Sequence, residues 1–144
     1  MAKTITVTVK KIDEITLPAT KSMRIDTADI MWFYTVNTND SRVYLKDADH
    51  MTGMTIIQID ETQANTVTAV NAVNSKIIDV TVKTMNEITL PATRTVSLSI
   101  DYLKRFEAEG ASDSQLYIQN FRMGTEVWVV DEAPATIDTA ISAL

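Results

Sequence analysis

Cysteine is absent from this chain of 144 residues, and histidine occurs once, at His50. Without cysteine there can be no disulfide bonds, cysteine-ligated zinc, iron–sulfur clusters or thiol catalysis. A Ser-His-Asp site would depend on His50, and no G-x-S-x-G nucleophile motif accompanies it. The three glycines, Gly53, Gly110 and Gly124, are too scattered for a phosphate-binding loop or a dinucleotide fingerprint. We therefore expect no enzymatic activity, no catalytic residues, no metal site and no cofactor.

Long apolar runs are also missing. No stretch approaches the roughly 18 apolar residues that a membrane span needs, and the first residues alternate threonine with isoleucine and valine. We therefore expect neither an export signal nor a membrane partner. Nineteen acidic side chains against thirteen basic ones give a formal net charge of -6, which repels phosphate backbones. Free nucleic acid is for this reason not an expected partner.

What the sequence does contain is an internal repeat. The heptapeptide EITLPAT occurs at Glu14–Thr20 and again at Glu87–Thr93, and eleven of fourteen letters agree between residues 7–20 and 80–93. The similarity continues, with a two-residue deletion near His50, to the last residue. Repetition at a fixed offset is the signature of a duplicated structural unit. We interpret the chain as a tandem duplication, with a first repeat unit at 1–74 and a second at 75–144.

Each repeat has the same predicted elements. Alternating threonine and β-branched residues predict strands, and Pro18 and Pro91 should end a strand or place it at a sheet edge. The segment TQANTVTAVNAV predicts a helix, and we interpret the preceding acidic pair, Asp60-Glu61, as a cap for its first N–H groups. The predicted fold class is α+β, mainly β: a duplicated sheet unit of about 4–5 strands, closed by one C-terminal helix per copy.

The two copies differ most where IMWFYTVN aligns with LKRFEAEG, so that Arg105 stands for Trp32 and Glu107 for Tyr34. Whether the second of these segments is a strand or a helix is left open by its residues. Alternation in a strand places Trp32 and Tyr34 together on the face opposite Phe33. An uncovered aromatic face would be a protein contact, whereas a covered one is core. The candidate partner-contact residues are Trp32, Tyr34, Arg105 and Glu107.

Two longer stretches of the sequence resemble a known family of proteins, and this resemblance implies a function. The strings ADIMWFYTVNTNDSRVYLKD and MTIIQIDETQANTVTAVNAV resemble the small, often repeated β-rich virion proteins of tailed bacteriophages. The resemblance implies a non-enzymatic structural protein, an auxiliary or decoration protein that is bound to the capsid and bridges its subunits. Its implied partners are the major capsid protein or other virion proteins, with self-association possible. The implied location is the virion, with the host cytoplasm before assembly.

A second hypothesis is a virion protein that binds carbohydrate or a host surface instead of the capsid. Trp32 and Tyr34 could form a stacking platform for sugars, which would make the protein a carbohydrate- or host-surface-binding module. The loop DADH, residues 47–50, could be imagined as a metal site, but it lacks the ligand spacing of a calcium loop, and we interpret it as solvated.

Overall fold

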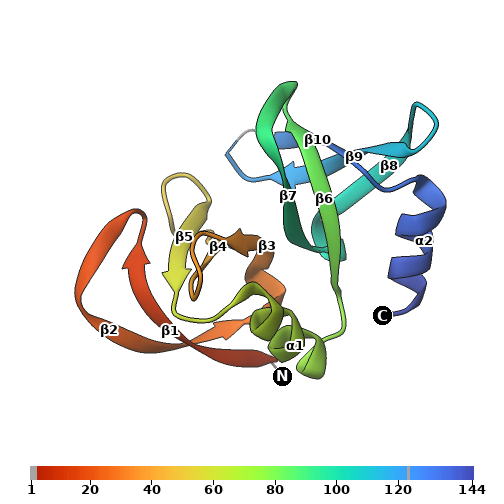
Figure 1. Cartoon of the computed structure of the whole chain (residues 1–144). Helices are drawn as coiled ribbons and strands as arrows, with labels where there is room; N and C mark the ends of the chain where they lie inside the picture. The colour runs from red at the N-terminus through yellow and green to blue at the C-terminus, as the bar shows by residue number, and fades with distance from the viewer. Residues whose placement is uncertain (1–2, 123) are drawn as a thin grey trace. The chain divides into compact units, whose positions relative to one another are not determined.

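The computed structural model describes residues 3–122 and 124–144, and the chain divides into two compact units, Met1–Ser75 and Lys76–Leu144. Both units contain the same elements in the same order: two long strands, a 3-10 turn, three shorter strands and a C-terminal helix. Each unit is described separately below (Figure 1).

The first unit is an antiparallel sheet of five strands in the order β2-β1-β5-β4-β3. Its long hairpin, β1 with β2, is drawn in red to orange in Figure 1. The elements are β1 (Thr4–Ile12), β2 (Ile15–Asp26), η1 (Thr27–Asp29), β3 (Ile30–Thr35), β4 (Ser41–Lys46), β5 (Met54–Ile59) and α1 (Gln63–Val73).

The second unit repeats this order as β7-β6-β10-β9-β8. Its elements are β6 (Ile77–Met85), β7 (Ile88–Ser99), η2 (Ile100–Tyr102), β8 (Leu103–Glu109), β9 (Asp113–Asn120), β10 (Gly124–Val130) and α2 (Pro134–Ser142). The segment YLKRFEAEG, whose state the residues left open, is therefore mostly strand β8.

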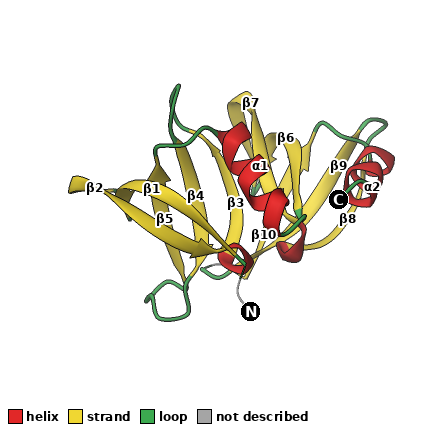
Figure 2. Ribbon diagram, turned by 90° about the horizontal axis from the view of Figure 1, so that it is seen from below, coloured by secondary structure: helices red, strands yellow, loops and turns green. Residues whose placement is uncertain are grey.

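The predicted α+β class, with a sheet unit closed by one helix per copy, is wrong. The fold is mainly β, because ten antiparallel strands stand against only two short α-helices (Figure 2). Helix α1 buries only Thr66 and Val70, and α2 buries only Ile137, so neither helix forms a layer over a sheet. Each helix has only two or three turns and buries few side chains. The helices therefore bury much less apolar area than the strands do.

The core follows the two-residue period of the strands. In β1, Ile5, Val7 and Val9 are buried, and the same register in β6 buries Ile78, Val80 and Val82. The shorter strands contribute further buried side chains. In the first unit these include Phe33, Val43, Ile57 and Ile59, and in the second Leu116, Ile118, Trp128 and Val130.

The interpretation of Asp60-Glu61 as a helix cap is also wrong. Helix α1 is capped by Thr62, whose side chain accepts a hydrogen bond from the Asn65 N–H at 3.2 Å. The carboxylate of Glu61 instead accepts the backbone N–H of Thr8 at 2.7 Å. In the second unit Glu132 accepts the N–H of Thr81 at 2.8 Å. These acids hold the chain before each helix against the first strand of its unit.

Within residues 3–122 and 124–144, no helix is long and apolar enough to cross a bilayer.

Candidate functional site

The repeated heptapeptide lies at the end of the first hairpin of each unit. We name residues 13–20 the first tip and residues 86–93 the second tip. Ile12 pairs with Ile15, and Met85 with Ile88, so each hairpin turns over two residues. Both turn residues have positive φ: 48° and 71° at Asp13 and Glu14, and 49° and 69° at Asn86 and Glu87. Such turns strongly prefer glycine, since a side chain costs about 1 kcal/mol or more in this region.

The first residue of each turn ties the tip to the neighbouring strand. The N–H of Asp13 donates to the carbonyl of Ile56 at 2.7 Å, and the N–H of Ile56 donates to Asp13 Oδ1 at 3.0 Å. Asn86 makes the same pair of contacts with Val127, at 2.7 and 2.8 Å. These paired hydrogen bonds offset part of the backbone strain, so both tips are held in one conformation.

Beyond the turn, the sequence LPAT leaves the strand ladder in both units. Thr16 pairs with Lys11 and Lys21 pairs with Val9, so four residues of β2 stand opposite Lys10 alone. The second unit has the same register break, with Leu90–Thr93 opposite Lys83. Proline cannot donate to a ladder, and here it lies in the unpaired stretch. The strands continue past the two prolines, while the pairing is interrupted there and resumes at Lys21 and Arg94.

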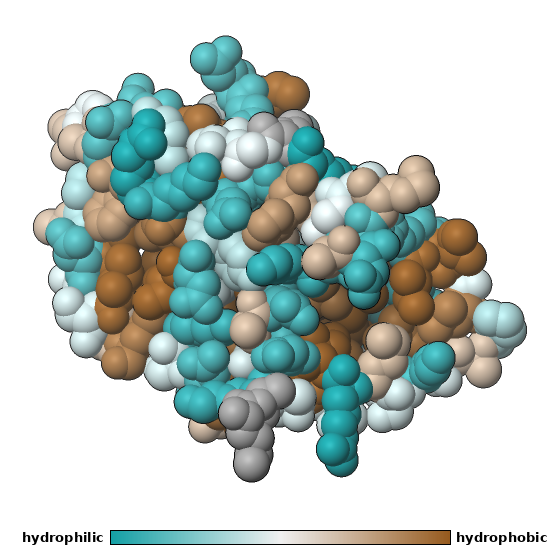
Figure 3. Space-filling view, turned by 180° about the vertical axis from the view of Figure 1, so that it is seen from behind, coloured by the Kyte–Doolittle hydropathy of each residue, from teal (hydrophilic) through white to brown (hydrophobic). Residues whose placement is uncertain are grey.

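Both tips present the same apolar side chain to solvent. Ile15 and Ile88 are each 70% exposed, although isoleucine is among the residues most often buried. Leu17 and Leu90 are half-buried, and the other residues of the heptapeptide are exposed in both copies. Hydrophobic residues also reach the surface elsewhere, as the brown areas among teal ones in Figure 3 show.

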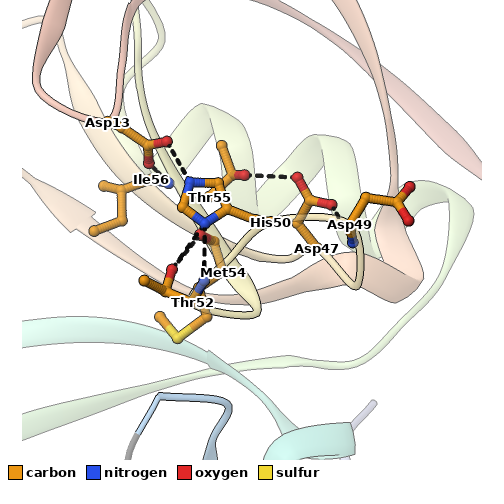
Figure 4. A network of polar contacts seen from close by, with 8 residues as sticks. All are labelled: Asp13, Asp47, Asp49, His50, Thr52, Met54, Thr55 and Ile56. Carbon is orange, nitrogen blue, oxygen red and sulfur yellow. Dashed lines mark hydrogen bonds and ion pairs between the residues drawn. The ribbon is translucent and has the colours of Figure 1, made fainter.

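The only histidine joins the first tip to the loop between β4 and β5 (Figure 4). His50 Nε2 lies 2.8 Å from Asp13 Oδ2, and the backbone N–H of Thr52 donates to His50 Nδ1 at 3.1 Å. Since Nδ1 accepts, the ring proton lies on Nε2 and is donated to Asp13. Asp47 closes the other end of the same loop, accepting the Thr55 hydroxyl at 2.7 Å. The solvated loop of the sequence-based interpretation is therefore partly ordered by side chains.

The same contacts define what this cluster can do chemically. Thr52 Oγ1 lies 2.9 Å from His50 Nδ1, so Thr52, His50 and Asp13 are arranged in the order of a catalytic triad. The hydroxyl, however, donates to the Met54 carbonyl at 3.1 Å, and the N–H of Thr52 already occupies Nδ1. A nucleophile needs that nitrogen free to take its proton. Within residues 3–122 and 124–144, no group of three or more potential His, Cys, Asp or Glu metal ligands comes together.

Two of the predicted contact residues are buried. Trp32 is 3% exposed and Tyr34 is 7% exposed. The Trp32 ring stacks on Tyr44 at 5.1 Å between centroids, and the hydroxyl groups of Tyr34 and Tyr44 are 2.9 Å apart. Burial, together with the hydrogen bond between the Tyr44 and Tyr34 hydroxyl groups, raises the pKa of Tyr44. This aromatic face is covered, so it offers no stacking platform in the described conformation.

The other two predicted residues lie on a solvent-exposed face. Arg105 and Glu107 are both exposed on β8. The Arg105 guanidinium lies 3.8 Å above the ring of Tyr117, and the Tyr117 hydroxyl donates to Glu107 at 2.9 Å. Tyr117 pairs with Arg105 as Tyr44 pairs with Trp32, so the second unit places a charged cluster where the first places an aromatic one. A cation–π contact at an exposed site contributes about 0.5–1 kcal/mol.

Residue patterns alone did not single out Ile15 and Ile88. The heptapeptide carries no reactive group, so no chemical motif points to it. One signal in the sequence could have pointed to the tips. Both copies keep glutamate, Glu14 and Glu87, at a turn position that prefers glycine. The exposed side chains of the two tips form the candidate functional site.

No protein-family model, curated protein sequence or solved structure matches this chain.

Proposed function

We propose that this protein is a non-enzymatic structural protein of a tailed-bacteriophage virion, a decoration protein that binds the capsid through its two hairpin tips. The partner in this proposal is the major capsid protein, which offers the same surface many times. The chain acts through surfaces, and the tips are the surfaces that both units share.

One observation carries the proposal. The heptapeptide of the tips, residues 14–20 and 87–93, is the longest stretch in which the two copies are identical, and nearly all of it is exposed. Elsewhere even the core has changed, with Trp128 at the position of Ile57. Exposed segments are ordinarily the first to vary, so identity there points to a shared contact. Glutamate at positive φ in both turns adds to this, since strain retained on a surface is often tied to function.

Two identical contacts in one chain suit a repeating partner. Each tip alone can cover only a modest area, well below the roughly 800 Å² per partner of a standard interface. Once one tip is bound, the second meets its site at a high local concentration, and avidity can exceed either affinity by about 10²–10⁴. A single unique partner would gain nothing from the second copy.

Co-sedimentation with phage heads tests the proposal. Ile15→Glu and Ile88→Glu should each weaken head binding, and the double variant should lose it by at least about a hundredfold, as expected for lost avidity. Met51→Glu is the matched control, because Met51 is fully exposed outside the tips. Equal binding by the double variant and the control would sink the proposal.

The alternative of a carbohydrate- or host-surface-binding module rested on Trp32 and Tyr34. Both side chains are buried, and no observation favours this alternative. Glycan titration monitored by tryptophan fluorescence would test it directly, and a response to any glycan would restore it.

A further inference from the structure

A cavity of about 310 Å³ opens within the first unit, and Ile12, directly before the first tip, is one of its lining residues. Its wall is apolar: Ile25 and Ile57 are buried there, while Ile12, Met23 and Leu45 are half-buried. A volume of this size lies at the lower end of the range for small-molecule sites, roughly 300–1,000 Å³. The cavity can therefore hold one ring system but not a large ligand.

The second unit shows what fills the corresponding position. Ile57 pairs with Ile12 and Val43, and its counterpart Trp128 pairs with Met85 and Leu116 in the same register. Trp128 is 0% exposed and is the largest fully buried side chain of the described residues.

A neighbouring lining residue, Leu45, is also less buried than its counterpart in the second unit. Leu45 of the first unit is half-buried, whereas its counterpart Ile118 is 0% exposed. One unit thus accommodates an indole ring of its own at a position where the other carries a smaller side chain beside a cavity.

The lining of the cavity also contains charged residues. Asp26, Asp29 and Asp47 are acidic, and Arg24 and Lys46 are basic. Asp47 receives hydrogen bonds from the Thr55 hydroxyl at 2.7 Å and the Asp49 N–H at 3.1 Å, which fix its carboxylate in place. In the second unit Asn120 takes the place of Asp47 and Glu126 the place of Thr55, and the Asn120 amide donates to the Glu126 carboxylate at 2.7 Å. The lining thus has one more acidic than basic residue, which favours a ligand that brings a positive charge.

We propose that this cavity binds a planar aromatic ring that carries a cationic group, of the kind found in an aryl ethylamine. The ring would occupy the apolar wall formed by Ile57, Leu45 and Met23, and the ammonium would lie near Asp47. This site lies in the first unit, and it is independent of the proposed role of the tips.

The test uses the full chain and tryptamine, with indole and indole-3-acetate as the neutral and anionic comparisons. Methyl NMR should show saturable shifts at Ile57, Leu45 and Met23 on adding tryptamine. Indole-3-acetate should bind at least about fivefold more weakly, which is the effect of one charge pair in water. Asp47→Asn, which copies Asn120, should weaken tryptamine by about the same factor and leave indole unchanged.

A filling variant completes the test. Ile57→Trp copies Trp128, so it should remove tryptamine binding while the far-ultraviolet circular dichroism stays that of the parent chain. If that variant fails to fold, the methyl shifts of the parent chain and the Asp47→Asn comparison decide the matter. The proposal is overturned if tryptamine produces no shifts up to millimolar concentrations, if the shifts lie in the second unit, or if indole-3-acetate binds as well as tryptamine.

Discussion

The carboxylate of Glu61 accepts the backbone N–H of Thr8 at 2.7 Å, across 53 positions of sequence. The contact joins the segment before α1 to the inside of β1, and Ser41 adds a second tie by donating to the Glu61 carbonyl at 2.9 Å. Glu132, Thr81 and Ser114 repeat both contacts in the second unit. An acid that looks in the sequence like a helix cap is thus a long-range link between strand and helix.

Glu61→Ala should lower the free energy of unfolding by about 1–3 kcal/mol, because it leaves the N–H of Thr8 without its partner. Asp60→Ala is the matched control, since Asp60 is exposed and should change stability by less than about 0.5 kcal/mol. Urea denaturation measures both, and hydrogen exchange at the Thr8 amide should speed up in Glu61→Ala only. Equal losses in the two variants would support the capping interpretation after all.

Asp40 should make stability fall in acid. Burial raises the pKa of Asp40, but hydrogen bonds from Asn37, Lys10 and Gln58 outweigh it and lower the pKa to about 2, against an ordinary value of 3.8. A lowered pKa means that the folded chain binds the proton less tightly than the unfolded chain. The stabilisation is therefore complete above the unfolded pKa and is lost as pH falls from about 4 to about 2.

The loss assigned to Asp40 should be about 1–2 kcal/mol over that interval. Thermal denaturation of the parent chain and Asp40→Asn between pH 5 and pH 2 separates this contribution from that of the other acids. The variant should start less stable and fall less steeply. Parallel curves for the two proteins would show that Asp40 does not cause the decline.

Glycine at the second turn residue should stabilise each hairpin. Glu14→Gly and Glu87→Gly relieve a side chain held at φ of 71° and 69°, so each should raise the free energy of unfolding by about 0.5–1 kcal/mol. Glu14 also forms an ion pair with Arg42 at 3.4 Å, and Glu14→Gly should therefore gain the smaller amount. Chemical denaturation gives both values. A loss of stability in either variant would mean that the turn is not strained.

Truncation at equivalent positions in the two units should lower stability by very different amounts. Trp32→Ala should cost about 3–5 kcal/mol, because it removes a buried ring that stacks on Tyr44. Arg105→Ala should cost less than about 1 kcal/mol, since it removes an exposed cation above Tyr117. Thermal melts of the two variants compare them directly, and similar losses would contradict the assignment of Trp32 to the core.

Local pattern predicted the elements better than the fold class. Threonine alternating with β-branched residues marked β1 and β6, and the letters of residues 62–73 marked α1, because both periods are set by the backbone. The class was wrong because a helix in sequence does not reveal how much it will bury. Of the valines in α1, Val73 is 41% exposed and Val70 is fully buried.

The candidate site was harder to predict, because exposure depends on which neighbour reaches a residue across the sheet. Trp32 is covered by Tyr44, whose partnership follows from a strand register that no local pattern fixes. Ile15 is exposed because it follows a two-residue turn at the end of a hairpin. Its alternation with Leu17 resembles that of core residues, so the pattern alone indicates burial.

The register break at LPAT has a consequence for engineering. Because the ladder stops at Thr16 and begins again at Lys21, the length of the intervening segment is not coupled to the pairing of β2 beyond it. A short foreign peptide placed between Pro18 and Ala19 would therefore leave the remaining strand contacts unshifted. Since the second copy has the same break, a single chain could carry two inserted epitopes at once.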